Sequence, residues 1–403
     1  MGLVKKLLAA LAALSVASAQ DFTQEEIDSG DVLKVLSKQA LDAAMARLPD
    51  SGEGCTKENV RVRREWQVVP RVEMSTTCGI DGPSRRELPG EMRIKYTDAI
   101  QCLMNSDSLY TDVEGAKTAF DDFAVLHYNL TPYVHNSATF LTFHRYYIHI
   151  LEEQLRNKCG YDGDFPYWEW GLDCADPQKS PLFDGSPTSL GSDGEPTAAN
   201  DSDAGAGFGG FPGMPGMGGG TGGGCVMEGP FSNYTVNLGP SSGADPLAYN
   251  PRCIKRNLNG QICAANASLR NTTDVITMAP DIELFQAMLQ GDFRYPESRG
   301  LGMATHGGGH FTIGGDPGGD FYFSPLEPAF FQHHGQIDRL YFIWQNLDWE
   351  NRQNIAGTGT MMNQPPSDEV KLTDILDVSP LGEPREIHEL LDTTGGPFCF
   401  VYE

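Results

Sequence analysis

The chain has 403 residues and carries 54 acidic against 29 basic side chains, which gives a formal net charge of −25. Charged residues make up 21% of the chain and hydrophobic residues 40%, a globular composition that excludes wholesale disorder and a collagen-like repeat. The strong negative charge argues against a protein that binds nucleic acid or an anionic membrane surface through a basic face.

Residues 1–19 have the layout of a secretory signal peptide. Lys5 and Lys6 precede an apolar run over residues 7–16, and the small residues Ala17-Ser18-Ala19 end it. This run is too short to span a bilayer, and no later stretch is long and apolar enough to do so. We therefore predict a secreted, extracellular protein with a signal peptide over 1–19 and a single domain over 20–403.

Secretion favours disulfides for the nine cysteines, because thiols are oxidised outside the cell. The odd count leaves at least one cysteine outside an intrachain pair, and the spacing alone does not predict the connectivity. Five Asn-x-Ser/Thr sequons fit a secreted glycoprotein: Asn129, Asn200, Asn233, Asn266 and Asn271.

Two segments have the periodicity of amphipathic helices. In residues 139–158, apolar side chains and one histidine recur every three or four positions: Leu141, His144, Ile148, Leu151 and Leu155. In residues 328–347 the same spacing joins Phe330, His334, Ile337, Tyr341 and Trp344. Gly160 follows the first segment as a stop signal. We predict two buried helices, each with a histidine on its core-facing side whose ring needs a partner.

Residues 180–224 form a low-complexity stretch that ends in a glycine-rich run. Such a run cannot bury enough apolar surface to offset its backbone entropy. We predict a mobile surface loop rich in Gly, Ser and Pro. A linker between two domains is the alternative, and we prefer the loop because histidine motifs flank it on both sides and must meet in space.

Seven of the nine histidines lie in two groups: His127, His135 and His144 in the first, and His306, His310, His333 and His334 in the second. His135 and His144 are nine residues apart, so they cannot share one face of a helix. Pro132 interrupts any helix that would join His127 to His135. We predict that His127 closes one helix, His135 lies in the loop that follows, and His144 projects from the next helix.

His306 and His310 are four residues apart, so on a helix their ring nitrogens can bind one metal together. The three glycines between them disfavour a helix by about 1 kcal/mol each relative to alanine. That cost indicates that another part of the molecule approaches this backbone closely. Two groups of imidazoles without a carboxylate or thiolate favour a pair of copper ions that react with O2; a hydrolytic zinc site is the alternative.

Several motifs resemble those of the tyrosinase and catechol oxidase family. The segment from His135 to Tyr146 resembles the copper A signature, and residues 306–310 with 324–339 resemble copper B. Residues 166–170 match the family's proline-tyrosine-tryptophan-acid-tryptophan segment. Residues 62–66 and 400–402 look like the arginine and aromatic-x-tyrosine marks that bracket the catalytic core. The resemblance covers nearly the whole chain after residue 19 and is greatest to the short secreted fungal polyphenol oxidases.

The resemblance implies a mainly α-helical fold in which a four-helix bundle holds a dinuclear copper centre, with long loops and few short strands. Two copper ions with O2 as co-substrate would oxidise o-diphenols to o-quinones, and some members of the family also hydroxylate monophenols. The implied copper ligands are His127, His135, His144, His306, His310 and His334.

The assignment of the last ligand rests on the resemblance. Helical periodicity accommodates either His333 or His334, but the family's ligand stands four residues before the aspartate of Asp338-Arg339, which is His334. We predict that His333 lies behind the ligands, that His149 is structural and that His388 is solvated.

Three further residues are predicted to decide the activity. Gly307 follows the first copper B histidine, where efficient monophenol hydroxylases often have an asparagine that holds a water with a nearby glutamate; Glu297 is the candidate glutamate. Phe321 lies thirteen residues before His334, at the position of the family's gate residue. A bulky ring there narrows access and stacks on a substrate. Gly307 and Phe321 together favour oxidation of catechols over hydroxylation of tyrosine.

The sequence therefore predicts a copper-dependent polyphenol oxidase that acts on small phenols with O2 and has no nucleic-acid or membrane partner. Three alternatives remain open: a tyrosinase with substantial monophenolase activity, an oxidase of o-aminophenols or substituted phenols, and a non-catalytic O2 carrier. Residues 400–402, which resemble the family's core-closing motif, lie directly before Glu403, so we expect no shielding domain and activity without proteolysis. The oligomeric state is not predicted.

Overall fold

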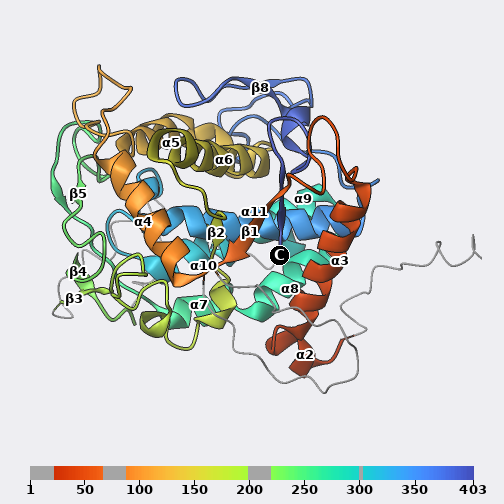
Figure 1. The fold of residues 1–403 in the computed structure, drawn as a ribbon, viewed down its shortest axis with the longest axis horizontal. Coiled ribbons are helices and arrows are strands. Elements are labelled where there is room, and N and C mark those ends of the chain that lie inside the picture. Colours follow the sequence, from red (N-terminus) through yellow and green to blue (C-terminus); the bar gives the residue numbers. More distant parts are fainter. Residues whose placement is uncertain (1–21, 67–87, 198–218, 299–302) are drawn as a thin grey trace, which may run out of the picture.

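A computed structural model describes residues 22–66, 88–197, 219–298 and 303–403 of the chain (Figure 1). The predicted signal peptide lies outside the described residues. The helices are α2 (Gln24–Asp28), α3 (Asp31–Arg47), α4 (Gly90–Met104), α5 (Asp121–Val134), α6 (Phe140–Cys159), α7 (Gly260–Asn266), α8 (Leu269–Met278), α9 (Ile282–Gln290), α10 (Ala304–Ile313) and α11 (Phe330–Leu347). The prediction of a mainly α-helical fold is confirmed.

Four helices form the centre of the molecule, as the predicted bundle requires. Figure 1 shows α5 and α6 side by side, with α11 running beneath them and α10 below it. Both predicted amphipathic segments are helices. α6 ends at Cys159, and Gly160 after it takes the left-handed conformation of a C-cap (φ 68°), while α11 ends at Leu347. Because α6 and α11 are buried along most of their length, tertiary packing stabilises them from all sides.

The first histidine helix is longer than the sequence predicts. We expect a helix that closes at His127, but α5 continues through Pro132 to Val134, and His135 follows it directly. Proline removes one backbone N–H and so leaves only one carbonyl near the helix end without its partner. Residues 121–127 of α5 are all buried, and this packing outweighs the single lost hydrogen bond.

The strands are few and short, as predicted. The central strand β1 (Arg61–Glu65) pairs in parallel with β2 (Pro166–Tyr167) on one side and β9 (Phe400–Tyr402) on the other. This sheet joins three segments that are far apart in the chain. Two-stranded pairs are formed by β3 (Gly194–Pro196) with β4 (Gly223–Val226), β5 (Thr235–Val236) with β6 (Arg252–Cys253), and β7 (Ile375–Leu376) with β8 (Arg385–Glu386).

Eight of the nine cysteines form disulfides, and Cys78 lies outside the described residues. The pairs are Cys55–Cys399, Cys102–Cys159, Cys174–Cys263 and Cys225–Cys253. The prediction that the cysteines form disulfides is thus confirmed for the described chain. Which cysteines are bonded to which is known only from the structure.

The predicted loop over residues 180–224 is packed at both ends. Leu182 and Leu190 are fully buried, and Arg256 donates hydrogen bonds to the carbonyl oxygens of Leu190 and Gly191. The far end returns through β4, which pairs with β3. Residues 180–197 are therefore packed rather than mobile, because two leucines anchor them in the core; residues 198–218 lie outside the described chain.

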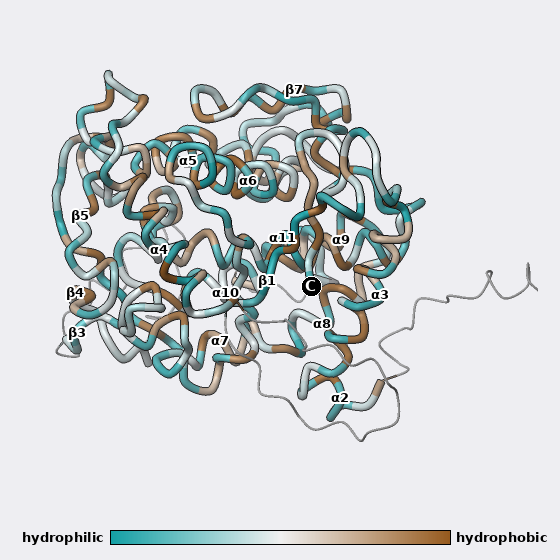
Figure 2. Tube along the Cα trace, in the orientation of Figure 1, coloured by the Kyte–Doolittle hydropathy of each residue, from teal (hydrophilic) through white to brown (hydrophobic). Residues whose placement is uncertain are grey.

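The surface helices alternate hydrophilic and hydrophobic residues, as α3 shows in Figure 2. Its buried side includes Val32, Leu33 and Leu36, and this side packs across α11. Among the described residues, no helix is both long and apolar enough to cross a membrane.

Candidate metal centre

The first histidine group, His127, His135 and His144, comes together between α5 and α6. One ring nitrogen from each lies within 4.8 Å of the others, and all three side chains are buried. The Nδ1 atoms are held by backbone carbonyls: His127 by Tyr322 at 2.9 Å, His135 by Thr131 at 3.1 Å and His144 by Phe140 at 2.8 Å. A carbonyl only accepts, so each Nδ1 carries the proton and each Nε2 keeps a free lone pair.

The Nε2 atoms of His127 and His144 are buried and have no hydrogen-bond partner among the described residues. Leaving a buried polar atom without a partner costs free energy. Neutral imidazoles with Nδ1 held and Nε2 free are the form in which histidine binds a transition metal. The first group therefore fits a metal ion.

The second histidine group, His306, His310, His333 and His334, lies between α10 and α11. Ring nitrogens of all four lie within 4.8 Å of one another, and the Nε2 atoms of His306 and His310 are 3.1 Å apart. The predicted spacing of His306 and His310 on one helix is confirmed, since both lie in α10. Two ring nitrogens of His333 and two of His334 are buried without a partner in the described part of the chain.

His333 and His334 face different neighbours. The ring of His334 stacks on His144 of the first group, with 4.2 Å between centroids, and so lies between the two groups. The ring of His333 contacts His310 at 4.2 Å and Trp170 at 5.2 Å. Sequence periodicity leaves both histidines open, and the structure brings both to the second group.

Burial keeps these rings neutral. It lowers the pKa of His127 to about 4 and that of His310 to about 3, below the ordinary value of 6.5. Burial, together with the positive charge that neighbouring rings would carry, holds the pKa values of the other members well below that value: His135, His144, His306 and His334. A neutral ring offers its lone pair to a metal at neutral pH without competition from protons.

The close approach predicted from the three glycines is present. A Cβ on Gly308 would lie 2.6 Å from Cβ of Asn266 in α7, and one on Gly309 would overlap the ring of His333. α10 can thus pack against α7 and α11 at these positions only because the side chains are absent.

Residues 117–347 match the family model for the common central domain of tyrosinase, which is more than half of the chain. The chain belongs to the tyrosinase family. It is 36% identical to tyrosinase P of Aspergillus terreus over 335 residues, which cover 78% of this chain and 90% of that protein. It is 33% identical over 393 residues to the N-acetyl-6-hydroxytryptophan oxidase of Emericella nidulans, covering 91% of this chain and 99% of that protein.

A solved structure of a polyphenol oxidase has the same fold as this chain. The polyphenol oxidase of Thermothelomyces thermophila, in the form of a glycine-to-asparagine mutant, superposes with a TM-score of 0.80 at 32% identity and covers 93% of this chain and 98% of that one. The protein is therefore a tyrosinase-family oxidase, and its cofactor is the dinuclear type-3 copper centre of the family, which the donor set of the two histidine groups fits.

Of the remaining residues singled out in the sequence, Phe321 and Gly307 lie near the histidine groups and His388 lies on the surface. Phe321 is partly exposed and its ring lies 4.8 Å from that of His135, at the edge of the first histidine group. Gly307 is buried in α10, directly after His306. Glu297 belongs to the short 3-10 turn Pro296–Ser298, and its side chain lies outside the described part. His388 is exposed and pairs with Glu386 at 3.1 Å, in agreement with the predicted solvated role.

A buried charge network beneath the bundle escaped the sequence analysis. Asp338, four residues after His334, accepts hydrogen bonds from Arg145 of α6 at 2.5 Å, Arg63 of β1 at 3.2 Å and the Tyr402 hydroxyl at 2.6 Å. Arg63 also pairs with Glu152 of α6 at 2.9 Å. Burial by itself would raise the pKa of Glu152, but Arg63 and Arg156 lower it to about 2. The sequence held one sign of this network: Arg63 and Tyr402 belong to the motifs at residues 62–66 and 400–402, and the network joins both motifs to the histidine helices.

Proposed function

We propose that this protein oxidises o-diphenols to o-quinones with O2, using two copper ions. His127, His135 and His144 would hold copper A, and His306, His310 and His334 would hold copper B. The observation that carries the proposal is the contact between two groups of buried, neutral imidazoles, with His144 and His334 stacked 4.2 Å apart. Two metal ions held by histidine groups in direct contact could act on one O2 molecule together.

When bound, the two copper ions would carry electrons from the diphenols to O2. Two o-diphenols lose four electrons and four protons and become two o-quinones, while one O2 becomes two waters. The chain's contribution is orientation: backbone carbonyls hold Nδ1 of the first group, and α10 holds His306 and His310 one turn apart. The buried surroundings keep the rings neutral and exclude bulk water.

We propose a preference for catechols over monophenols. The ring of Phe321 lies against His135 and is partly exposed, so it can stack on an incoming phenol and restrict its size. Gly307 offers no side chain that could hold a water for deprotonating a monophenol. Both residues support the catechol assignment, and Glu297 remains the candidate partner for such a water.

An extracellular location is part of the proposal. Four disulfides in the described chain support it, because disulfides persist in oxidising compartments. The leader-like segment 1–19 and the sequons support it independently.

A second candidate substrate class is a hydroxylated indole. The relative that aligns with 91% of this chain is an N-acetyl-6-hydroxytryptophan oxidase, so this compound belongs in the substrate panel.

The test is O2 consumption by the copper-loaded protein with 4-tert-butylcatechol, tyrosine and N-acetyl-6-hydroxytryptophan side by side. Uptake with the catechol and little with tyrosine is the expected result. Prompt uptake with both would contradict the roles given to Gly307 and Phe321. Uptake with the indole alone would replace the catechol assignment, and no uptake with any phenol would overturn the oxidase proposal.

A further inference from the structure

The helix that carries His306 and His310 is intrinsically weak. α10 reads Ala-Thr-His-Gly-Gly-Gly-His-Phe-Thr-Ile, and each of its three central glycines disfavours a helix by about 1 kcal/mol relative to alanine. The two histidines approach each other only if the segment between them makes a full helical turn. Contacts from outside the helix must therefore maintain this turn.

The first set of contacts comes from α7 and the residues before it. The backbone N–H groups of Asn257 and Asn259 donate to the carbonyl oxygens of Ile313 and Thr312, at the end of α10, at 3.1 and 2.9 Å. One turn earlier, Gly308 faces Asn266 so closely that a Cβ would lie 2.6 Å from the asparagine Cβ. α7 thus runs along α10 and supports the glycine turn directly.

The second set of contacts comes from Trp170. A Cβ on Gly309 would lie 3.0 Å from Nε1 of Trp170, and the indole ring is 5.2 Å from the ring of His333. Trp170 is fully buried, and its N–H has no hydrogen-bond partner in the described chain. Packing rather than hydrogen bonding therefore positions this indole against α10.

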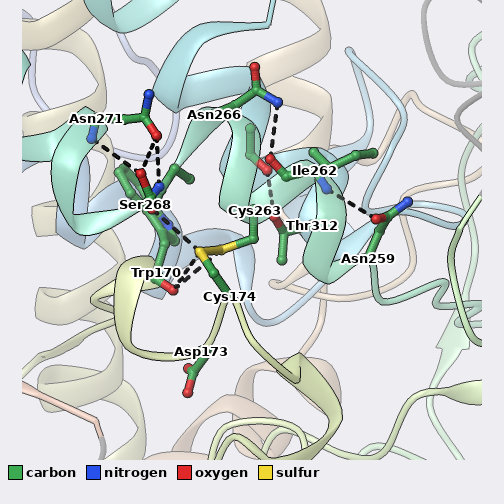
Figure 3. Close-up of a disulfide and its surroundings, with 12 residues drawn as sticks. Trp170, Asp173, Cys174, Asn259, Ile262, Cys263, Asn266, Ser268, Asn271 and Thr312 are labelled. Atoms are coloured by element: carbon green, nitrogen blue, oxygen red, sulfur yellow. Dashed lines mark hydrogen bonds between the residues drawn. A yellow bond between two sulfur atoms is a disulfide. The ribbon is translucent and has the colours of Figure 1, made fainter. Parts of the chain in front are cut away.

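The Cys174–Cys263 disulfide joins these two supports (Figure 3). Cys263 lies in α7 and Cys174 lies four residues after Trp170. Both sulfur atoms lie 3.4 Å from the carbonyl oxygen of Trp170. The bond thus joins α7 to the segment that carries Trp170, and both of these elements closely approach the glycines of α10.

We propose that the Cys174–Cys263 disulfide is a positioning element of the copper B site, which holds α7 and Trp170 against α10 and so keeps His306 and His310 one turn apart. This inference rests on the proposed function in one respect, that these two histidines bind copper B. Its structural part, the dependence of α10 on the disulfide, can be measured without metal.

The test compares two pairs of substitutions in the full chain: Cys174→Ser with Cys263→Ser, and Cys102→Ser with Cys159→Ser as the matched control. The two disulfides close loops of 89 and 57 residues, so the chain-entropy losses are similar. The control bond joins α4 to the end of α6, the helix of His144. Amide hydrogen exchange is followed in α10 and α5 of the metal-free proteins, and copper per chain is then measured after loading.

We expect exchange in α10 to rise at least about tenfold relative to α5 when Cys174 and Cys263 are replaced, and not in the control. Copper should fall from two ions per chain to one. The remaining isolated Cu(II) should give an electron paramagnetic resonance signal that a coupled pair lacks. Equal exchange in α10 for both variants, with two coppers bound in each, would overturn the proposal. If the wild-type protein itself does not bind two coppers, the proposed function fails, while the exchange comparison still decides the role of the disulfide.

A second variant keeps the test decisive if the cysteine variant does not fold. Gly308→Ala pushes Asn266 and α7 away from α10 while the disulfide stays intact, and it should raise α10 exchange and weaken copper B binding in the same direction. Gly90→Ala is the matched control, because its Cβ would meet only Thr188 at an ordinary 3.7 Å. Wild-type exchange and copper content in Gly308→Ala would contradict the claimed support by α7.

Discussion

The two histidine groups reach the same chemistry by different structural means. In the first group, each Nδ1 is held by a backbone carbonyl, and two of the three carbonyls belong to the residue four positions earlier. In the second group, the nitrogens of His333 and His334 have no partner among the described residues, and α10 depends on glycines that fit against its neighbours. The first site is oriented largely by its own chain segments, whereas the second depends on tertiary packing.

The largest expected effect is the loss of copper B, which should follow the replacement of His334 and not that of His333. His334→Gln should remove copper B and lower the oxidation rate by on the order of 10³-fold, about 4 kcal/mol in activation free energy. His333→Gln should retain two coppers per chain, because the family's ligand position falls on His334, whose ring lies between the two groups, whereas the His333 ring lies on the Trp170 side of the second group. Copper analysis of both variants measures this. Loss of copper from His333→Gln with retention in His334→Gln would reverse the ligand assignment.

The next largest effect is expected on folding stability, when the Asp338 carboxylate that joins β1 to α6 is removed. Asp338→Asn leaves Arg63 and Arg145 without their shared carboxylate, and the loss of one partner from a buried ion pair costs about 3–5 kcal/mol of folding stability. Urea unfolding of the metal-free variant measures the change. Asp50→Asn, which removes an exposed pair with Lys57, is the control and should leave the midpoint unchanged. A similar midpoint for both variants would show that the network contributes little.

Acid should lower the folding stability of the metal-free protein, because both histidine groups are buried in the neutral form. The folded pKa values of His127 and His310, about 4 and about 3, lie below the unfolded value of 6.5, so the unfolded chain binds protons at higher pH than the folded one. Stability is therefore complete above pH 6.5 and decreases as the pH falls from 6.5 toward 4. Thermal unfolding at a series of pH values measures this. A flat profile in the wild type would contradict the burial of the rings.

The smallest expected effect concerns access to the first group. Phe321→Ala removes a ring that lies against His135 and should raise kcat/KM for bulky phenols several-fold, at the cost of about 1 kcal/mol of stacking with simple catechols. Leu109→Ala, an exposed apolar residue on the surface, is the control. An unchanged substrate profile in Phe321→Ala would remove its assignment as a gate.

Local patterns predicted much of the site. The three- and four-residue spacing around His144 and His334 identified α6 and α11, and the four-residue spacing of His306 and His310 placed both on one helix, because helical periodicity depends only on neighbours in the chain. The same local logic failed at Pro132, where the burial of α5 outweighs one lost hydrogen bond, and at Leu182 and Leu190, which anchor a segment of low complexity.

By itself, the sequence determined the helix pairs, the histidine donors and the family that they resemble. Tertiary structure alone decided which cysteines pair, which neighbours His333 and His334 face, and how Asp338 joins the terminal strands to the histidine helices. The physical reason is distance along the chain. Helical spacing is set within a few residues, whereas Cys174 meets Cys263, and Arg63 meets Asp338, only after the whole chain has packed around one core.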